Sequence, residues 1–373
     1  AGGATSAFAG VIEDGVGTVA LTKVGGGTFT LTGVCTHTGG TTVSAGTLLV
    51  NGSVAASALD VRSGATLSGA GTTGAVTVES AGAVTPGNST AILSTGTIGF
   101  SAGAVFSVEI NGPVAGVEHD QLNVTGTVSL SSASLYVFAG FLPVPGDESV
   151  VINNDGADTV VGTFAGLPEG ALVLGGSADF YITYGGGDGN DVGLVAAPPT
   201  VVYADDSWAT VPPGEDPDGS GPAIAFGIDA FATIQDAVNG VRDQGTVYVH
   251  TGIYNENVNV AHGMTIAAVD GAQEPVLQGP GTGIGVSVSA PDVTVTGLIF
   301  DSFATDFSST SGGTINDCRF SGTTMGVAHT GAAMVDARHN WWGHASGPSG
   351  PGHDGHGSGM SVYVVFRPWR GDG

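Results

Sequence analysis

The sequence predicts an all-β protein built as a parallel β-solenoid, a right-handed β-helix. Three observations predict it: a short repeat in residues 42–106, a repeat unit too short to fold alone, and a chain rich in small residues. Of the 373 residues, 66 are glycine, while 41% are hydrophobic and 11% are charged. This composition is typical of an ordered protein with many turns. The length indicates two or three domains.

The repeat unit is a few alternating residues, a turn of small residues and a few more alternating residues. Its four turns contain glycines at steps of 18, 18 and 21 residues, namely Gly46, Gly64, Gly82 and Gly103. Glycine can adopt the positive φ that such a turn requires. A unit this short cannot bury its apolar side chains alone, so neighbouring units must stack around one core. Valine, threonine and leucine favour strands, which makes these units coils of a β-solenoid.

Related phrases cover roughly the first half of the chain. They include LTKVGGGTFTLTG at 21–33, THTGGTTVSAGTL at 36–48 and GTFAGLPEG at 162–170. As a set these motifs resemble the passenger repeat of bacterial autotransporters and related giant surface proteins. The resemblance implies an extracellular or cell-surface β-helix. Because the chain opens within a repeat, we expect it to be a mature or excised part of a longer secreted protein.

The charge balance excludes some partners. Seven Lys and Arg residues stand against 33 Asp and Glu residues, a net charge of -26. This charge repels nucleic acid and anionic membranes, and no apolar run is long enough to span a bilayer. We therefore expect neither nucleic-acid binding nor membrane insertion. Bound Ca²⁺ would relieve the negative charge, although an acidic surface that keeps the protein soluble explains it equally well.

Two acidic loops are candidates for Ca²⁺ binding. The loop at 186–191 supplies Asp188 and Asp191, but such ion-binding turns work as stacked copies and only one is present. A turn that closes the last coil is the favoured interpretation. In the other loop Asp216, Asp218 and Ser220 alternate as Ca²⁺ ligands do, without the terminal glutamate of an EF-hand. A turn rich in Asp, Pro and Gly explains the same residues.

The sequence divides into two solenoid segments. Residues 196–200 (AAPPT) interrupt the pattern and predict a linker between a passenger-repeat-like segment at 1–195 and a second β-helix at 201–373. The two cysteines, Cys35 and Cys318, fall in different segments, so we expect buried or free thiols and no intrachain disulfide.

One short helix is predicted, near 233–242. Thr233 can cap it with Asp236 reaching back, and Ile234, Val238 and Val241 form one apolar stripe. Strand alternation resumes at 245–260. We expect this helix to cover the open first coil of the second segment, because an uncovered sheet edge invites pairing with another chain.

The second segment resembles the pectin-lyase-like group of right-handed parallel β-helix proteins. The resemblance rests on FATIQDAV at 231–238, GTVYVHTGIYNENVNV at 245–260 and HNWWGHASGP at 339–348. A 20-residue spacing predicts three columns of stacked side chains, namely Val295, Ile315 and Val335; Leu298, Cys318 and Arg338; and Phe300, Phe320 and Asn340.

Members of that group include polysaccharide lyases, hydrolases and non-enzymes, so the fold alone does not decide activity. A lyase needs a Lys or Arg base beside a Ca²⁺-bound uronate, and the one lysine, Lys23, lies in the first segment. The 20-residue spacing would stack Arg319 on His339 with Asp317 on the same side, as an acid/base patch. Asp336 and Arg338 are further candidates. A surface ladder of polar residues with weak ion pairs is the favoured interpretation.

His353 and His356 could hold Zn²⁺ or Cu²⁺, since imidazole suits these ions and the surrounding loop is glycine-rich. Two further ligands would be needed and the spacing assures none. We therefore favour a solvated loop.

Taken together, these patterns favour a non-catalytic extracellular protein. It would be a segment of a bacterial surface fibre or adhesin that self-associates head to tail through its solenoid ends, with Ca²⁺ as a stabiliser. The alternative is a β-helix that binds or degrades polysaccharide through Asp317, Arg319 and His339. A third reading is an adhesin whose acidic surface binds other surfaces through divalent ions.

Overall fold

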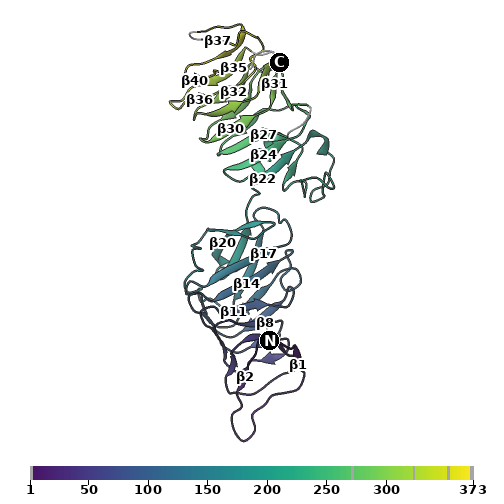
Figure 1. Cartoon of the computed structure of the whole chain (residues 1–373), viewed down its shortest axis with the longest axis vertical. Coiled ribbons are helices and arrows are strands. Elements are labelled where there is room, and N and C mark those ends of the chain that lie inside the picture. The colour runs from purple at the N-terminus through teal and green to yellow at the C-terminus, as the bar shows by residue number, and fades with distance from the viewer. Residues whose placement is uncertain (1–2, 270–272, 322–323, 351–352, 370–373) are drawn as a thin grey trace. The chain divides into compact units, whose positions relative to one another are not determined.

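The structure is a computed structural model that describes residues 3–269, 273–321, 324–350 and 353–369. The chain folds into two compact units, Ala1–Ala197 and Pro198–Gly373. Each unit is a stack of parallel strands, seen as successive arrows in Figure 1. None of the described helices has the length and apolar character needed to cross a membrane.

The first unit consists of three sheets that run along the coils. Sheet A contains β1 (Ser6–Phe8), β3 (Thr28–Leu31), β5 (Gly46–Val50), β8 (Ala65–Gly69), β11 (Ala83–Pro86), β14 (Val105–Ile110) and β17 (Ser134–Ala139). Sheet B contains β2 (Leu21–Lys23), β4 (Thr41–Val43), β7 (Leu59–Val61), β10 (Val76–Val78), β13 (Ile98–Phe100) and β16 (Val128–Ser129). Sheet C contains β6 (Ser53–Val54), β9 (Thr72–Thr73), β12 (Ile92–Thr95), β15 (Gln121–Val124), β18 (Glu148–Asn154), β21 (Asp191–Ala196), β20 (Asp179–Gly186) and β19 (Leu172–Leu174).

Pairing in sheets A and B is parallel throughout, which confirms the predicted solenoid. Inward positions stack from coil to coil: Leu48 pairs with Leu67, Leu67 with Val84, and Val84 with Phe106. All four side chains are fully buried. The core is thus a set of apolar columns, and coils of unequal length keep the columns aligned because the turns absorb the extra residues.

The predicted glycine column is partly wrong. Gly46 pairs with Ala65, one residue beyond Gly64. In the next coils Gly64 N donates to Ala81 O and Ala81 N to Gly103 O, so the stacked turn position of the third coil is Ala81, with φ 62°, rather than Gly82.

The end of the first unit departs from the predicted coil. β18 pairs antiparallel with β21, β21 with β20, and β20 with β19. The loop at 186–191 is therefore a turn, as predicted, but one that joins two antiparallel strands rather than closing a coil. Phe180, Ile182, Val192 and Leu194 are buried on these strands and extend the core.

The second unit also contains three sheets. Sheet D contains β23 (Ala230–Phe231), β22 (Val201–Ala204), β24 (Gly245–Val249), β27 (Met264–Ala268), β30 (Val293–Thr296), β33 (Gly313–Asn316), β36 (Val335–Asp336) and β40 (Val364–Val365). Sheet E contains β25 (Ile253–Tyr254), β28 (Val276–Gln278), β31 (Ile299–Asp301) and β34 (Arg319–Ser321). Sheet F contains β26 (Val258–Val260), β29 (Ile284–Val288), β32 (Thr305–Ser309), β35 (Met325–His329), β39 (Gly357–Met360), β37 (Pro348–Gly350) and β38 (His353–Asp354).

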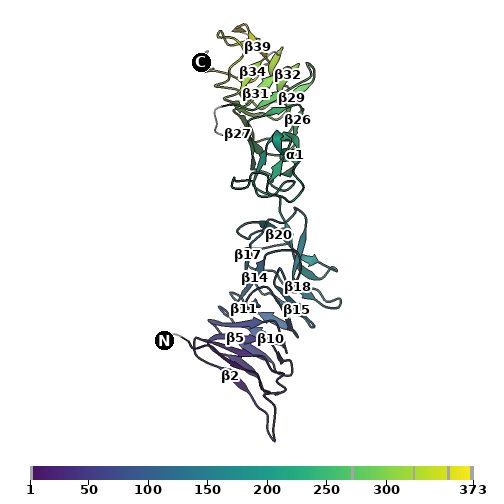
Figure 2. The same ribbon diagram turned by 90° about the vertical axis from the view of Figure 1, so that its right-hand side faces the viewer.

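The predicted helix is α1 (Ile234–Gly240), and a 3-10 turn, η1 (Asp206–Trp208), precedes it. Thr233 caps α1, since its side chain accepts a hydrogen bond from Asp236 N at 3.0 Å. The carboxylate of Glu256 accepts from Ile234 N and Gln235 N at 2.7 and 2.9 Å and thereby ties α1 to the next coil. The helix contacts β22, β24 and β26 at the start of the unit, as Figure 2 shows.

The 20-residue columns hold for one step and then shift. Val295 pairs with Ile315 and Phe300 with Phe320, as predicted. In the following coil Gly313 pairs with Val335, and Arg319 pairs with Trp341, so the step becomes 22 residues. The apolar column consequently runs from Phe300 through Phe320 to the buried Trp342, with ring centroids 5.7 and 4.9 Å apart.

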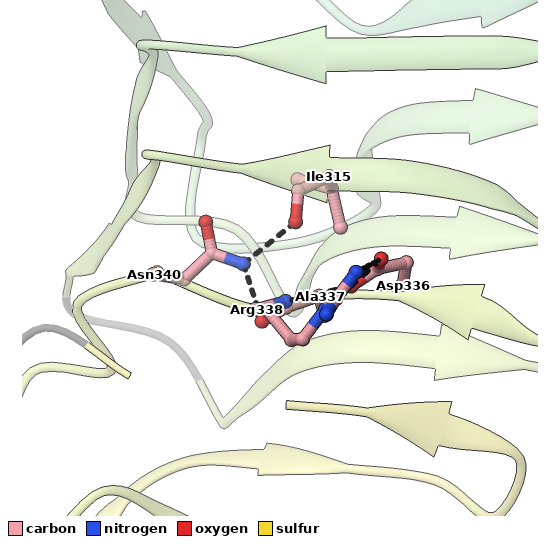
Figure 3. A network of polar contacts seen from close by, with 5 residues as sticks. All are labelled: Ile315, Asp336, Ala337, Arg338 and Asn340. Atoms are coloured by element: carbon pink, nitrogen blue, oxygen red, sulfur yellow. Dashed lines mark hydrogen bonds and ion pairs between the residues drawn. The ribbon is translucent and has the colours of Figure 1, made fainter. Parts of the chain in front are cut away.

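The two extra residues are accommodated by a turn around Asn340, which is fully buried. Its Oδ1 accepts from Cys318 N at 2.8 Å, and its Nδ2 donates to Ile315 O and Ala337 O, each at 2.8 Å (Figure 3). The amide thus satisfies three backbone groups that the turn leaves unpaired.

Both cysteines are buried and form no disulfide, as predicted. Burial raises the pKa of the Cys318 thiol to about 12, so this side chain stays protonated and behaves as a small core residue.

Candidate functional site

A groove of about 730 Å³ lies on the outer face of sheet D. We call it the tyrosine groove, and define it by Tyr203, Tyr248, Ala267, Thr296, Glu274 and Asp317. Strand register builds it: Tyr203 pairs with Tyr248, Tyr248 with Ala267, and Ala267 with Thr296. These positions point to the same face of neighbouring strands, so two large rings stand beside a floor of small side chains.

The aromatic wall is a packed cluster. The rings of Tyr203 and Tyr248 stack with centroids 5.8 Å apart and planes inclined by 22°. His250 lies 6.1 Å from the ring of Tyr203 and 5.5 Å from that of the buried Trp208. Partial burial, followed by the neighbouring Tyr248, raises the pKa of Tyr203, so its hydroxyl is protonated at neutral pH. This cluster therefore presents half-buried aromatic surface and neutral hydroxyl groups.

The opposite side of the groove is acidic. Glu274 and Asp317 line it, and Arg319 Nε lies 3.9 Å from Glu274 Oε2. Asp317 follows β33 in a turn with φ 52°. The structure thus brings Asp317 to the groove and places Arg319 beside the carboxylate that lines it.

The predicted stacking of Arg319 on His339 is wrong. Arg319 pairs with Trp341, because the coil is two residues longer than the spacing of the preceding ones. His339 lies in a turn with φ 62° and donates from its backbone N to Pro368 O. The predicted three-residue patch is therefore not assembled by coil register.

Asp336 and Arg338 form a surface ion pair. Arg338 Nε lies 2.8 Å from Asp336 Oδ1, and Nη2 2.5 Å from Oδ2. The Arg338 guanidinium lowers the pKa of Asp336 and the carboxylate raises that of Arg338. The pair neutralises itself at the edge of the Asn340 turn (Figure 3).

The first predicted Ca²⁺ loop is held together by its own backbone. Asp216 Oδ1 accepts from Asp218 N and Gly219 N at 3.1 and 2.8 Å, and Asp218 Oδ2 accepts from Ala223 N at 3.2 Å. Ser220 N donates to Asp218 O. These are the contacts of an Asp-rich turn.

In the second loop Asp191 is buried and Asp188 is exposed. Asp191 Oδ1 accepts from Asn154 N at 2.7 Å, and Oδ2 accepts from Asp188 N at 3.4 Å. Asp191 thus joins the hairpin turn to β18. Across the described ranges, no three His, Cys, Asp or Glu side chains converge as a metal site would require.

The histidine loop brings together a different pair from the predicted one. His344 and His356 meet edge to face with centroids 5.4 Å apart, and His344 Nδ1 lies 2.8 Å from Ser346 Oγ. His353 lies in β38, and its side chain falls outside the part of the chain that is described.

The one lysine has a structural position. Lys23 is 8% exposed, and its Nζ donates to Val24 O, Gly25 O and Ala45 O at 3.1, 2.7 and 2.8 Å. All three partners are backbone carbonyls at the turns of the first coils. Lys23 therefore closes one end of the apolar core.

Sequence analysis missed the aromatic wall. The signal was present in the alternation of VVYA at 201–204 and TVYVH at 246–250, where each tyrosine occupies an outward position among inward valines. An outward aromatic residue in a strand marks a surface with a role beyond the core. That the two tyrosines meet depends on pairing across 45 residues, which no local pattern gives.

Comparison with known proteins places the repeat. Residues 21–50 match the family model of the passenger-associated transport repeat. A stretch of 68 residues is 48% identical to an extracellular serine protease of Serratia marcescens, covering 18% of this chain and 6% of that protein. The matched stretch is therefore a small part of that relative. The first unit carries an autotransporter passenger repeat, and both similarities point to an extracellular or surface-exposed protein.

Proposed function

We propose that this chain is a non-catalytic structural segment of an extracellular bacterial fibre or adhesin, whose solenoid ends stack head to tail. The observation that carries the proposal is the open edge of the first coil. Among the described residues, β1 and β2 are the outermost strands of sheets A and B. Unpaired strand edges are templates for another chain. Stacking of one end on a different end generates a filament, because such contacts do not close.

The hydrogen-bond pattern of β2 identifies the free group. Leu21 N donates to Gly40 O at 3.1 Å, toward the next coil. Successive backbone N–H groups of a strand point to opposite sides, so the N–H of Thr22 faces the open edge. Thr22 is also exposed. A neighbouring strand would pair here.

Two features support a non-catalytic role. Lys23, the one lysine of the chain, is bound to three carbonyls and is not free to act as a base. Arg319 is paired in register with Trp341 and not with His339. Ca²⁺ enters the proposal as a stabiliser, because a net charge of -26 on each copy opposes close stacking and divalent ions reduce that repulsion.

The test compares Thr22→Pro with Thr22→Val. Proline removes only the outward N–H of an edge strand, whereas valine retains it and preserves the β-branched shape. Sedimentation velocity and electron microscopy over a range of concentrations, with Ca²⁺ or with chelator, give the readout. We expect the unmodified chain and Thr22→Val to form linear assemblies and Thr22→Pro to remain monomeric. A chain that stays monomeric at every concentration, or a proline variant that assembles normally, would refute the proposal.

A further inference from the structure

The tyrosine groove contains the ingredients of a ligand site that the stacking of coils does not require. Its volume of about 730 Å³ falls within the range of small-molecule and oligosaccharide sites. It extends over β22, β24, β27 and β30, which lie side by side in the second unit (Figure 1). The groove therefore suits an elongated ligand that crosses several strands.

The hollow is kept open by small residues. Ala267 and Ala268 form its floor, and Gly297 follows on the next strand with φ 79°. A Cβ at Gly297 would lie 2.8 Å from the Cβ of Ala268, so this position accepts glycine alone without a shift. The column that begins with Tyr203 and Tyr248 thus drops abruptly to a low floor.

The lining combines aromatic surface with hydrogen-bond acceptors. Tyr203 and Tyr248 present half-buried rings, while Glu274 and Asp317 present carboxylates on the other side. Sugar rings have apolar faces that pack on aromatic rings and hydroxyl groups that donate to carboxylate oxygens. This pairing of surfaces matches a saccharide better than it matches a purely apolar ligand.

Charge selects among saccharides. The described residues that line the groove include two carboxylates and neither lysine nor arginine. The nearest guanidinium described here, that of Arg319, faces Glu274. A polyuronate would place its own carboxylates against these groups, and the net charge of -26 would repel it further. An amino sugar would gain from the same carboxylates and from the tyrosine rings.

We propose that the tyrosine groove binds an oligosaccharide of neutral or amino sugars and discriminates against polyuronates. This inference is independent of head-to-tail stacking, since β2 and the groove lie in different units. It also differs from the uronate substrate that the resemblance to pectin-lyase-like proteins implied.

The test is calorimetric titration of the full chain with hexamers of glucose, N-acetylglucosamine, glucosamine and galacturonate. Two variants alter the groove: Tyr248→Ala removes a ring, and Ala267→Phe fills the floor. Two matched controls are Tyr136→Ala, at a tyrosine 53% exposed in the first unit, and Thr265→Phe, on the same strand and face as Ala267. Circular dichroism confirms that each variant is folded.

We expect a neutral or amino-sugar hexamer to bind and the galacturonate hexamer not to bind. Tyr248→Ala should weaken binding about tenfold, the scale of one lost aromatic contact, and Ala267→Phe should abolish it. Both controls should bind as the unmodified chain does. Absence of binding by all three neutral and amino-sugar hexamers, preference for galacturonate, or full binding by the folded groove variants would overturn the proposal.

Discussion

The ammonium group of Lys23 lies 2.8 Å from the carbonyl oxygen of Ala45, in the turn of the neighbouring coil. Lys23 occupies the inward column of sheet B, where it pairs with Val43. Its stem continues the apolar column, and its Nζ binds the carbonyls that the turns leave exposed at the end of the core. A single cation thus links two coils at the end where the proposed stacking occurs.

Lys23→Met should destabilise the first unit by about 1–3 kcal/mol, because three carbonyl groups lose a charged donor. Arg62→Met is the matched control, since Arg62 is 46% exposed and pairs with Asp60 and Glu79 at the surface. Surface pairs contribute about 1 kcal/mol or less. Urea unfolding followed by circular dichroism gives both values. Equal losses for the two variants would show that Lys23 has no special structural role.

Asn340→Ala should destabilise the second unit by about 2–4 kcal/mol, since it leaves one buried N–H and two buried carbonyls without partners. Arg338→Ala, two residues away in the same turn (Figure 3), removes only the exposed ion pair and should cost about 1 kcal/mol or less. Thermal and urea unfolding measure the difference. If Asn340→Ala were as mild as its neighbour, the turn would draw its hydrogen bonds from water instead.

Ala81→Gly should stabilise the first unit slightly, by about 0.5 kcal/mol. Ala81 has φ 62° at a position where the adjacent coils contain Gly64 and Gly103. Left-handed backbone costs a non-glycine residue about 1–2 kcal/mol, and the greater freedom of glycine in the unfolded chain offsets about 0.5–1 kcal/mol. Gly82→Ala is the informative partner, because Gly82 has no positive φ to relieve. Stabilisation by neither Ala81→Gly nor any change at this turn would argue against the stacked register.

Asp120 should make the stability of the first unit depend on pH. The side chain accepts from Ala91 N and Glu109 N at 2.9 Å each, and burial, partly offset by these bonds, raises its pKa to about 6. The folded state therefore holds the proton more tightly than the unfolded state, whose pKa is about 4. The resulting contribution is complete below pH of about 4 and is lost as pH rises to about 6, a change of up to about 2 kcal/mol.

Urea unfolding from pH 3 to 8 measures this dependence. Asp120→Asn keeps the shape without the titration and should flatten the profile between pH of about 4 and 6. Glu109→Gln removes the neighbouring exposed carboxylate and should leave the fall in stability in place. An unchanged profile in Asp120→Asn would assign the pH dependence to other groups.

The solenoid could be predicted because its signal is local and repeated. Thr233, α1 and the first 20-residue step were likewise visible in short patterns. The 22-residue step was not, because it depends on whether Asn340 can satisfy a longer turn, and that is a property of three-dimensional contacts. The same reason explains why Arg319 and His339 were wrongly stacked.

The tyrosine groove was hidden for a related reason. Tyr203 and Tyr248 are separated by a long loop and by α1, and only strand pairing brings the rings together. The antiparallel end of the first unit was also missed, since alternation of apolar residues does not distinguish parallel from antiparallel pairing. Local patterns thus predicted the coils, whereas the surfaces formed between coils required the structure.

The central claim is that the edge of β2 accepts another strand, and hydrogen exchange at the amide of Thr22 tests it most directly. Exchange is measured by mass spectrometry or NMR at low and at high protein concentration, with the amide of Leu21, bound to Gly40 O, as the internal reference. The account predicts that Thr22 exchanges freely in dilute solution and becomes protected as concentration rises, while Leu21 stays protected throughout. A Thr22 amide that exchanges equally at both concentrations would contradict stacking through this edge.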